Sequence, residues 1–416
     1  MLRRACYLYL MKPTTLYHNL VDLHQRRTYP AAIDIQDGTI IRIEPTDKPC
    51  THYILPGFVD AHVHIESSLL LPSAFARLAV RHGTVATVSD PHEIANVCGM
   101  DGVRYMLRNA ARVPFKFHFG APSCVPATAF ETAGAVLGPE EVDMLLQDEQ
   151  IYYLSEMMNY PGVLQHQPDV MQKIALARKY GKPVDGHAPG LKGDLARRYI
   201  EAGIQTDHEC VNMEEALDKV RYGMKILIRE GSAARNLDAL LDLLDHYPDQ
   251  VMFCCDDQHP DRLMEHHIND HVKRALAKGK NLYDVLRAAS VNPVMHYHLP
   301  VGLLREGDEA DYIVVDDLDK LTVLQTVIRG ELVFSDGHVS LPHLDEEPIN
   351  QFSCILPSLD EFACLAPAFP FRLRVIEALN GQLLTQTYYT TPLIREGKVL
   401  ANPDADILKI VVVNRY

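Results

Sequence analysis

Eight short apolar segments with the length of β-strands recur between residues 54 and 256, and amphipathic helical patterns separate several of them. The strand-like segments cover residues 54–61, 84–90, 115–122, 151–157, 183–187, 204–208, 225–229 and 251–256. The helical patterns cover residues 170–180, 195–202, 237–246 and 262–277. Alternating strands and helices are typical of parallel βα units, and eight units can close into a barrel. We therefore predict an α/β fold with a (β/α)8 TIM-like barrel at residues 56–300.

Side chains that commonly bind metals stand where several predicted strands end. His62 and His64 are separated by one residue, so in an extended strand both imidazoles point to the same side. The other candidate ligands, each closing a later apolar segment, are Glu156, His187, His208, Asp256 and Asp257. Active sites of (β/α)8 barrels lie at the C-terminal ends of the strands. The sequence therefore predicts that these side chains meet in one metal centre.

The type of these ligands indicates a centre with two metal ions. One ion is assigned to His62, His64 and Asp256, and the other to His187 and His208. The carboxylate of Glu156 offers two oxygens and is predicted to bridge both ions. No lysine stands at the end of that strand, which disfavours a modified-lysine bridge. Nitrogen and oxygen ligands suit Mn, Fe or Zn ions better than a thiolate-binding ion.

A centre of this kind indicates hydrolysis, because a divalent cation lowers the pKa of bound water from ~15.7 towards ~7. Asp256 is predicted to be the general base, which takes the proton of the water and passes it to the departing group. Glu209 follows His208 and is the candidate acid for protonating a ring nitrogen. Adjacent residues on a strand point to opposite faces, which weakens the assignment of Glu209.

Several of these residues also have a structural interpretation. Asp90 and His92 are predicted to bind substrate, although an Asp before Pro91 also fits a helix N-cap. Ser232 is predicted to line the pocket, and a helix N-terminus explains it as well. For Glu156 and the two later histidines, the alternative is a capping role or a hydrogen-bonded place in the core.

Two neighbouring carboxylates end the eighth predicted strand, and only one is needed as a metal ligand. Asp256 is preferred to Asp257, which is assigned to substrate binding instead. Cys254 and Cys255 directly before them are interpreted as buried strand residues rather than ligands.

The segments on both sides of the predicted barrel read as short strands with tight turns. Asp-Gly pairs at residues 37–38 and 336–337 are strong hairpin signals between strand-like segments. We predict that residues 1–55 and 301–340 combine into one small β-sandwich domain.

Composition excludes several function classes. The formal net charge of −15, without a Lys/Arg block, argues against a nucleic-acid partner. No apolar run approaches the roughly 20 residues of a membrane helix. The apolar stretch within residues 1–11 is too short for a signal peptide, and Met11 competes with Met1 as the natural start. Nine cysteines without CxxC spacing predict a reduced, cytoplasmic protein without disulfides.

The chain resembles the bacterial adenine deaminase family of the amidohydrolase superfamily. The segments that carry the resemblance are, in order, PGFVDAHVHIESS (56–68), SDPHEIANV (89–97), PSCVPAT (122–128), EMMNYPGV (156–163), DGHAP (185–189), DHE (207–209), REGSAAR (229–235) and DD (256–257). The strand-end ligands resemble those of the superfamily. The runs that contain Asp90 and Glu156 resemble adenine deaminases in particular.

The resemblance implies a metal-dependent hydrolase that cleaves a cyclic amidine C–N bond, converting adenine to hypoxanthine and ammonia in purine metabolism. It implies two divalent ions, Mn(II) or Fe(II) before Zn(II), and attack of an activated hydroxide on C6 of the purine. We expect adenine as the small-molecule partner, no nucleic-acid or membrane partner, and a homo-oligomer.

Members of this family continue past the point matched by residues 406–416, with a β-domain that the resemblance places near the pocket mouth. Residues 341–416 are therefore expected to be a partial, truncated C-terminal β-domain, with a strand at 407–416. Two alternative functions stay open. One is a catalytically impaired member that binds metal or purine, and the other is a hydrolase of a different cyclic amide.

Overall fold

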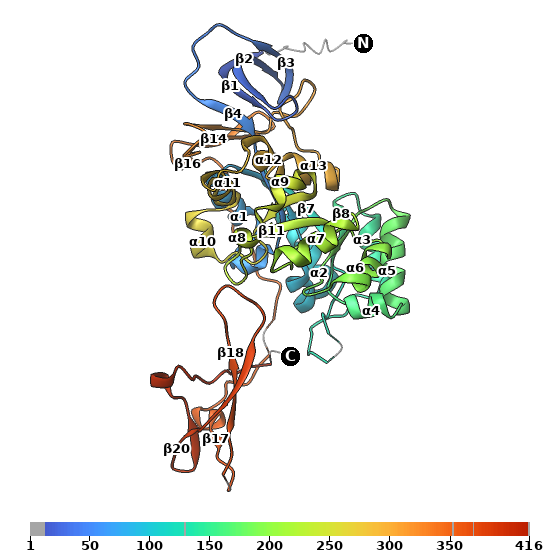
Figure 1. The fold of residues 1–416 in the computed structure, drawn as a ribbon, viewed down its shortest axis with the longest axis vertical. Helices are drawn as coiled ribbons and strands as arrows, with labels where there is room; N and C mark the ends of the chain where they lie inside the picture. The colour runs from blue at the N-terminus through green and yellow to red at the C-terminus, as the bar shows by residue number, and fades with distance from the viewer. Residues whose placement is uncertain (1–12, 129, 352, 369, 415–416) are drawn as a thin grey trace, which may run out of the picture.

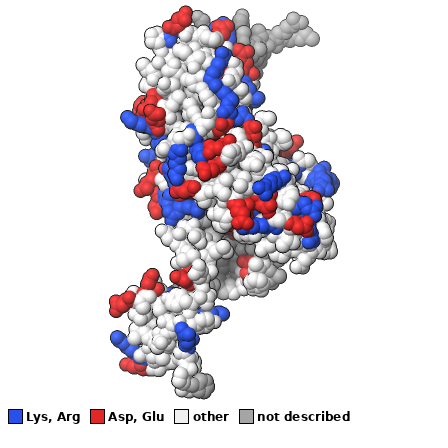
Figure 2. All heavy atoms as spheres, in the orientation of Figure 1, with Lys and Arg blue, Asp and Glu red and all other residues white. Residues whose placement is uncertain are grey.

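The computed structural model describes residues 13–414 except 129, 352 and 369. The predictions about residues 1–11 lie outside this part of the chain. Three bodies follow one another along the molecule in Figure 1: a β-sheet module, a central α/β barrel, and a C-terminal segment of small sheets. On the face shown in Figure 2, side chains of both charges are interspersed over the described residues.

Eight parallel strands form the central barrel, as predicted. They are β5 (Phe58–Val63), β6 (Thr84–Ser89), β7 (Lys116–Ala121), β8 (Ile151–Met157), β9 (Val184–Gly186), β10 (Thr206–Asp207), β11 (Lys225–Arg229) and β12 (Val251–Cys254). Strands β5 to β9 pair in order, and so do β10 to β12. Backbone hydrogen bonds of 2.9 Å, from Gln205 N to Val184 O and from Asp256 N to His62 O, close the two gaps.

Helices follow most strands and cover the barrel. They are α1 (Pro72–Ala79), α2 (His92–Ala110), α3 (Pro139–Gln147), α4 (Tyr160–Leu164), α5 (Pro168–Lys179), α6 (Gly193–Glu201), α7 (Met213–Arg221), α8 (Leu237–Leu240), α9 (Leu243–His246), α10 (Pro260–Glu265), α11 (Ile268–Ala277), α12 (Leu282–Ala288) and α13 (Val291–Tyr297). One buried cluster of apolar side chains runs through barrel and helices. Within the described residues, none of the helices combines the length and apolar character required to cross a membrane.

Two predicted helices are each divided in two. Residues 237–246 form α8 and α9, and residues 262–277 form α10 and α11. The second break has a tertiary cause, because His267 between the helices is drawn into the barrel wall. Its Nδ1 lies 2.6 Å from Thr84 Oγ1 and its Nε2 lies 3.0 Å from Asp60 Oδ2. Contacts with strands far away in the sequence therefore override the local helical pattern.

The first predicted strand, residues 54–61, is also divided. Its first half is β4 (Tyr53–Pro56), which pairs with β1 and β13 of the outer sheet, and barrel strand β5 begins at Phe58. The chain changes sheets at Gly57, where a Cβ would lie 2.3 Å from Val85 Cγ1. This close approach requires glycine. The apolar pattern continues across the break because both halves are buried.

Both flanks of the barrel contribute to one eight-stranded sheet with the order β16-β15-β14-β13-β4-β1-β2-β3. Its other strands are β1 (Thr14–Asp22), β2 (Arg27–Gln36), β3 (Thr39–Pro45), β13 (Tyr312–Val315), β14 (Val323–Ile328), β15 (Glu331–Ser335) and β16 (His338–Val339). Both predicted Asp-Gly turns are present, with positive φ angles at Asp37, Gly38, Asp336 and Gly337. The sheet folds over a separate small core, and Ala310 N donates to Gly38 O across it at 2.7 Å.

The C-terminal segment contains only short strands, namely β17 (Cys364–Leu365), β18 (Leu373–Glu377), β19 (Gln386–Thr390), β20 (Leu393–Arg395) and β21 (Lys398–Leu400). The loop between β18 and β19 reaches back to the barrel (Figure 1), where Arg235 N donates to Gly381 O. Over the described part of the strand predicted at 407–416, no strand is formed. Ile407 makes one bridge to Asn402, and residues 408–413 belong to no strand.

A buried ammonium group joins the barrel to the outer sheet. Lys116 at the start of β7 donates to Pro300 O at 2.6 Å and to the carboxylates of Glu309 and Asp311. The Asp311 side chain is fully buried and also accepts hydrogen bonds from the backbone of Gly302 and Arg329. The ion pair between Lys116 and Asp311 therefore fixes the position of the segment directly before β13.

We predict that Lys116→Met lowers the free energy of unfolding by about 3–5 kcal/mol, because it leaves the Asp311 carboxylate buried without its cation. Urea denaturation measures the change. Lys179→Met, which removes an exposed pair with Asp143, is the control and should cost less than about 1 kcal/mol. Equal effects of the two variants would contradict the assigned role of Lys116.

A second prediction concerns His118, which is buried in β7 with its ring against Tyr152. Burial lowers the pKa of His118 to about 3, so the folded protein keeps it neutral while the unfolded chain protonates near pH 6.5. Stability is therefore full above pH 6.5 and falls as the pH decreases from 6.5 towards 3. Between pH 6.5 and 5 the loss from this group is about 2 kcal/mol. Urea denaturation of His118→Gln should show a correspondingly smaller acid sensitivity than the parent, and an unchanged sensitivity would refute this.

Candidate metal centre

Strand β5 brings two imidazoles to the C-terminal end of the barrel. His62 and the following His64 are both buried, and their Nε2 atoms lie 3.1 Å apart. Asp256, just after β12, faces both rings, with its Oδ1 3.1 Å from His64 Nε2 and 3.5 Å from His62 Nε2. Asp256 has a φ of 57°, an unusual backbone for a non-glycine residue at a functional site. These three predicted ligands therefore converge.

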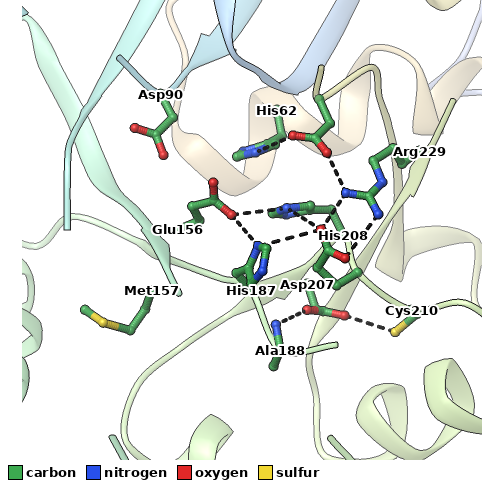
Figure 3. A network of polar contacts seen from close by, with 12 residues as sticks. His62, Asp90, Glu156, Met157, His187, Ala188, Asp207, His208, Cys210 and Arg229 are labelled. Atoms are coloured by element: carbon green, nitrogen blue, oxygen red, sulfur yellow. Dashed lines mark hydrogen bonds and ion pairs between the residues drawn. The ribbon is translucent and has the colours of Figure 1, made fainter. Parts of the chain in front are cut away.

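The other three predicted ligands lie on the opposite side of the same centre (Figure 3). Glu156 near the end of β8 has its Oε2 2.7 Å from His187 Nδ1 and 3.2 Å from His208 Nε2. Its other oxygen, Oε1, lies 3.3 Å from His64 Nε2. The two oxygens of one carboxylate thus face the two groups of histidines, which is the arrangement that a bridging ligand requires.

The donor set fits divalent metal ions. Within the described residues, several groups of three or four side chains have ligand atoms within 4.8 Å of one another, among them His62–His64–Asp256 and His62–Glu156–His208. Burial opposes the charged form of His208, yet the carboxylates of Glu156 and Asp256 raise its pKa to about 9. The centre therefore holds excess negative charge that a cation can neutralise.

Glu209 faces the centre, despite the alternation expected for neighbouring strand residues. Its Oε1 lies 3.4 Å from His208 Nε2 and 3.6 Å from His187 Nδ1. Strand β10 ends at Asp207, so alternation does not apply to the two residues that follow it.

Arg229, which the sequence analysis did not select, points into the same network as His208 (Figure 3). It ends β11, and its guanidinium donates to both oxygens of Glu209 and to Asp256 Oδ2. A charged residue closing the apolar run of β11 was a signal of its own, because buried charges need partners.

Asp90 and His92 line the centre next to Glu156. His92 Nδ1 lies 3.0 Å from Asp90 Oδ2 and 3.5 Å from Glu156 Oε1. Helix α2 begins at His92 without a side-chain cap, so the N-cap interpretation of Asp90 is wrong. Asp90 Oδ1 is buried without a hydrogen-bond partner, and this leaves an acceptor open. The neighbouring Glu93 also faces the centre, with its Oε1 3.3 Å from His64 Nδ1.

Asp257 and Ser232 lie together in the loops after β12 and β11. The Asp257 carboxylate accepts a hydrogen bond of 2.5 Å from Ser67 Oγ, and its backbone oxygen accepts one from Ser232 N. Ser232 Oγ accepts from His259 N at 2.9 Å, and helix α8 starts only at Leu237. Ser232 therefore does not cap that helix. Asp256, rather than Asp257, has its carboxylate directed at the histidine pair.

The fold matches that of solved enzyme structures, among them a dipeptidase and a deacetylase. The β-aspartyl dipeptidase of Fervidobacterium islandicum AW-1 aligns with 80% of the chain and 100% of that structure, at a TM-score of 0.59 and 14% identity. The N-acetyl-D-glucosamine-6-phosphate deacetylase of Mycobacterium smegmatis aligns with 77% of the chain at a TM-score of 0.57 and 16% identity. These similarities concern the fold alone.

Sequence comparison is more specific. Residues 53–333 match the amidohydrolase family. The adenine deaminase of Salinibacter ruber is 55% identical over 397 residues, which are 95% of this chain and 72% of that protein. The adenine deaminase of Parabacteroides distasonis is 49% identical over 407 residues, 97% of this chain and 74% of that protein. The chain therefore belongs to the amidohydrolase family and, within it, to the adenine deaminase family.

Proposed function

We propose that the protein hydrolyses adenine to hypoxanthine and ammonia. The observation that carries this proposal is the combination of 46–55% identity to adenine deaminases over about 95% of the chain with six convergent ligands of the expected types. The six side chains come from five different strand ends and meet at one buried place. The site is thus built for hydrolysis, and the family relationship supplies the substrate.

The ligand assignment follows the two groups of side chains. His62, His64 and Asp256 would hold one divalent ion, His187 and His208 the other, and Glu156 would contact both. Mn(II) or Fe(II) are the ions we propose, with Zn(II) as the alternative, since all donors are nitrogen or oxygen. When bound, such ions would lower the pKa of a water molecule and supply a nucleophile at neutral pH.

Two carboxylates of the protein are proposed to transfer the protons of the reaction. As water adds to C6 of adenine, Asp256, whose carboxylate lies beside the histidine pair, accepts a proton from it. The same carboxylate returns the proton to the amino nitrogen, so that the C6–N bond breaks and ammonia leaves. Glu209, whose carboxylate faces His187 and His208, is the proposed proton carrier for the ring. It gives a proton to a ring nitrogen and regains one from the new C6 hydroxyl as the C6 carbonyl forms.

We assign substrate binding to Asp90, His92, Ser232 and Asp257. The open oxygen of Asp90 is suited to accept a hydrogen bond from an N–H group of the purine. Ser232 and Asp257 lie in the loops after β11 and β12, at the same end of the barrel.

We also propose a cytoplasmic homo-oligomer that takes part in adenine catabolism. A reducing compartment is supported by the spacing of the nine cysteines, which includes no CxxC pair. The oligomeric state is inferred from the family alone.

The function is tested by hypoxanthine production from adenine, using protein loaded with Mn(II) or Fe(II). We expect turnover that His64→Ala reduces on the order of 1,000-fold, because metal ions supply several kcal/mol of transition-state stabilisation. His343→Ala changes an exposed histidine and should leave the rate unchanged. No turnover of adenine at full metal occupancy would contradict the proposal. Turnover of another cyclic amide in that case would identify a hydrolase of a different substrate. No turnover of any substrate would indicate a catalytically impaired member of the family.

A second experiment distinguishes the two neighbouring carboxylates. Asp256→Asn should weaken Mn(II) binding by about 100-fold, because it neutralises a proposed ligand. Losing a residue that only supports a ligand costs up to about 100-fold, so the loss of a ligand should cost at least as much. Asp257→Asn should bind Mn(II) like the parent and instead raise the KM for adenine. Chelator competition measures the affinity. The opposite pattern would transfer the ligand role to Asp257.

A further inference from the structure

A buried arginine links two carboxylates that belong to different halves of the centre. Arg229 is 3% exposed, and its Nη1 donates to Glu209 Oε1 and to Asp256 Oδ2, both at 2.5 Å. Its Nη2 donates to Glu209 Oε2 at 3.1 Å. Glu209 follows His208 after β10, whereas Asp256 follows β12 beside the pair on β5. The guanidinium on β11 therefore spans both neighbouring strands.

This contact determines which oxygen of Asp256 is available. Oδ2 is occupied by Arg229, and Oδ1 is directed at His62 and His64. A carboxylate without such a partner can rotate about its terminal bond and exchange its two oxygens. The planar guanidinium is suited to hold two carboxylates at fixed angles, and a point charge such as an ammonium cannot reproduce this geometry.

Arg229 is itself held rigidly. Its backbone N donates to Asn236 Oδ1 at 2.7 Å, and its backbone O accepts from Asn236 N at 2.9 Å. The amide of Asn236 in turn donates to the backbone oxygens of His208 and Cys210. The end of β11 is thus tied to the segment that carries His208 and Glu209. A shift of the β11 end would therefore displace that segment as well.

We propose that Arg229 is a positioning residue that fixes Asp256 in the orientation needed for metal binding and ties it to Glu209, beside His208. Its planar fork is required for this as well as its charge. The role rests on the metal ligands assigned under the proposed function, and the Arg229 guanidinium acts on them through its hydrogen bonds to Asp256 and Glu209. It acts through Asp256, whose Oδ1 it leaves directed at His62 and His64. It also acts through the segment after β10 that carries His208 and Glu209.

The test measures Mn(II) affinity by chelator competition, without substrate, in Arg229→Ala, Arg229→Lys and Arg274→Ala. Arg274 is the matched control, because it pairs with Glu230, Asp238 and Asp270 on the outside of the barrel. Loss of an outer-shell partner typically costs 10–100-fold in metal affinity. We expect Arg229→Ala to weaken Mn(II) binding by that factor, with partial recovery on addition of ethylguanidinium, and Arg274→Ala to bind like the parent.

Arg229→Lys should recover less affinity than ethylguanidinium does in Arg229→Ala. Full recovery by lysine would overturn the requirement for the fork, and parent-like binding by Arg229→Ala would overturn the role altogether. If Arg229→Ala does not fold, Arg229→Gln retains side-chain bulk and an N–H donor, and the same weakening is expected from it. Because no adenine is present, failure of this inference is distinguishable from failure of the deaminase assignment.

Discussion

The closure of the barrel between its first and last strands is the contact on which the centre depends. Asp256 N donates to His62 O at 2.9 Å, and His64 N donates to Asp256 O at 3.1 Å. These backbone bonds satisfy the edges of β5 and β12, and they also set the carboxylate of Asp256 beside two imidazoles. A change that opens the barrel at this seam would therefore also separate the ligands proposed for the first metal ion, so stability and chemistry share one set of hydrogen bonds.

The second group of ligands is held by a buried polar network rather than by strand pairing. Lys219 is 1% exposed, and its three donors reach Ala188 O, Asp207 Oδ2 and Glu215 Oε1 at 2.7–2.9 Å. Asp207 also accepts from Ala188 N, directly after His187 (Figure 3). Because β9 and β10 are only three and two residues long, these side-chain bonds replace the ladder that longer strands would provide. A fully satisfied network of this kind favours one conformation of the loop.

Sequence patterns predicted which side chains converge because their geometry is local. Two residues of spacing place His62 and His64 on one side, and parallel strands deliver their ends to one edge. Arg229 closes an apolar run, but its partners follow other strands, so the local pattern does not show what it contacts. The break at Gly57 was hidden since both strands around it are buried, and the break at His267 depends on Thr84 and Asp60. The fold was thus accessible from periodicity, whereas the contacts that orient the ligands were not.

The balance of charge explains why the centre is suited to cations beyond Arg229. The guanidinium supplies one permanent positive charge to Glu209 and Asp256, whereas the carboxylate of Glu156 faces histidines instead. Unpaired charge is costly in a protein interior. Burial opposes the charged form of His208, yet Glu156 and Asp256 raise its pKa to about 9, whereas burial lowers the pKa of His62. On the proposed ligand assignment, metal ions and protons would compete for the ring nitrogen of His208, so metal binding would release a proton and strengthen as the pH rises.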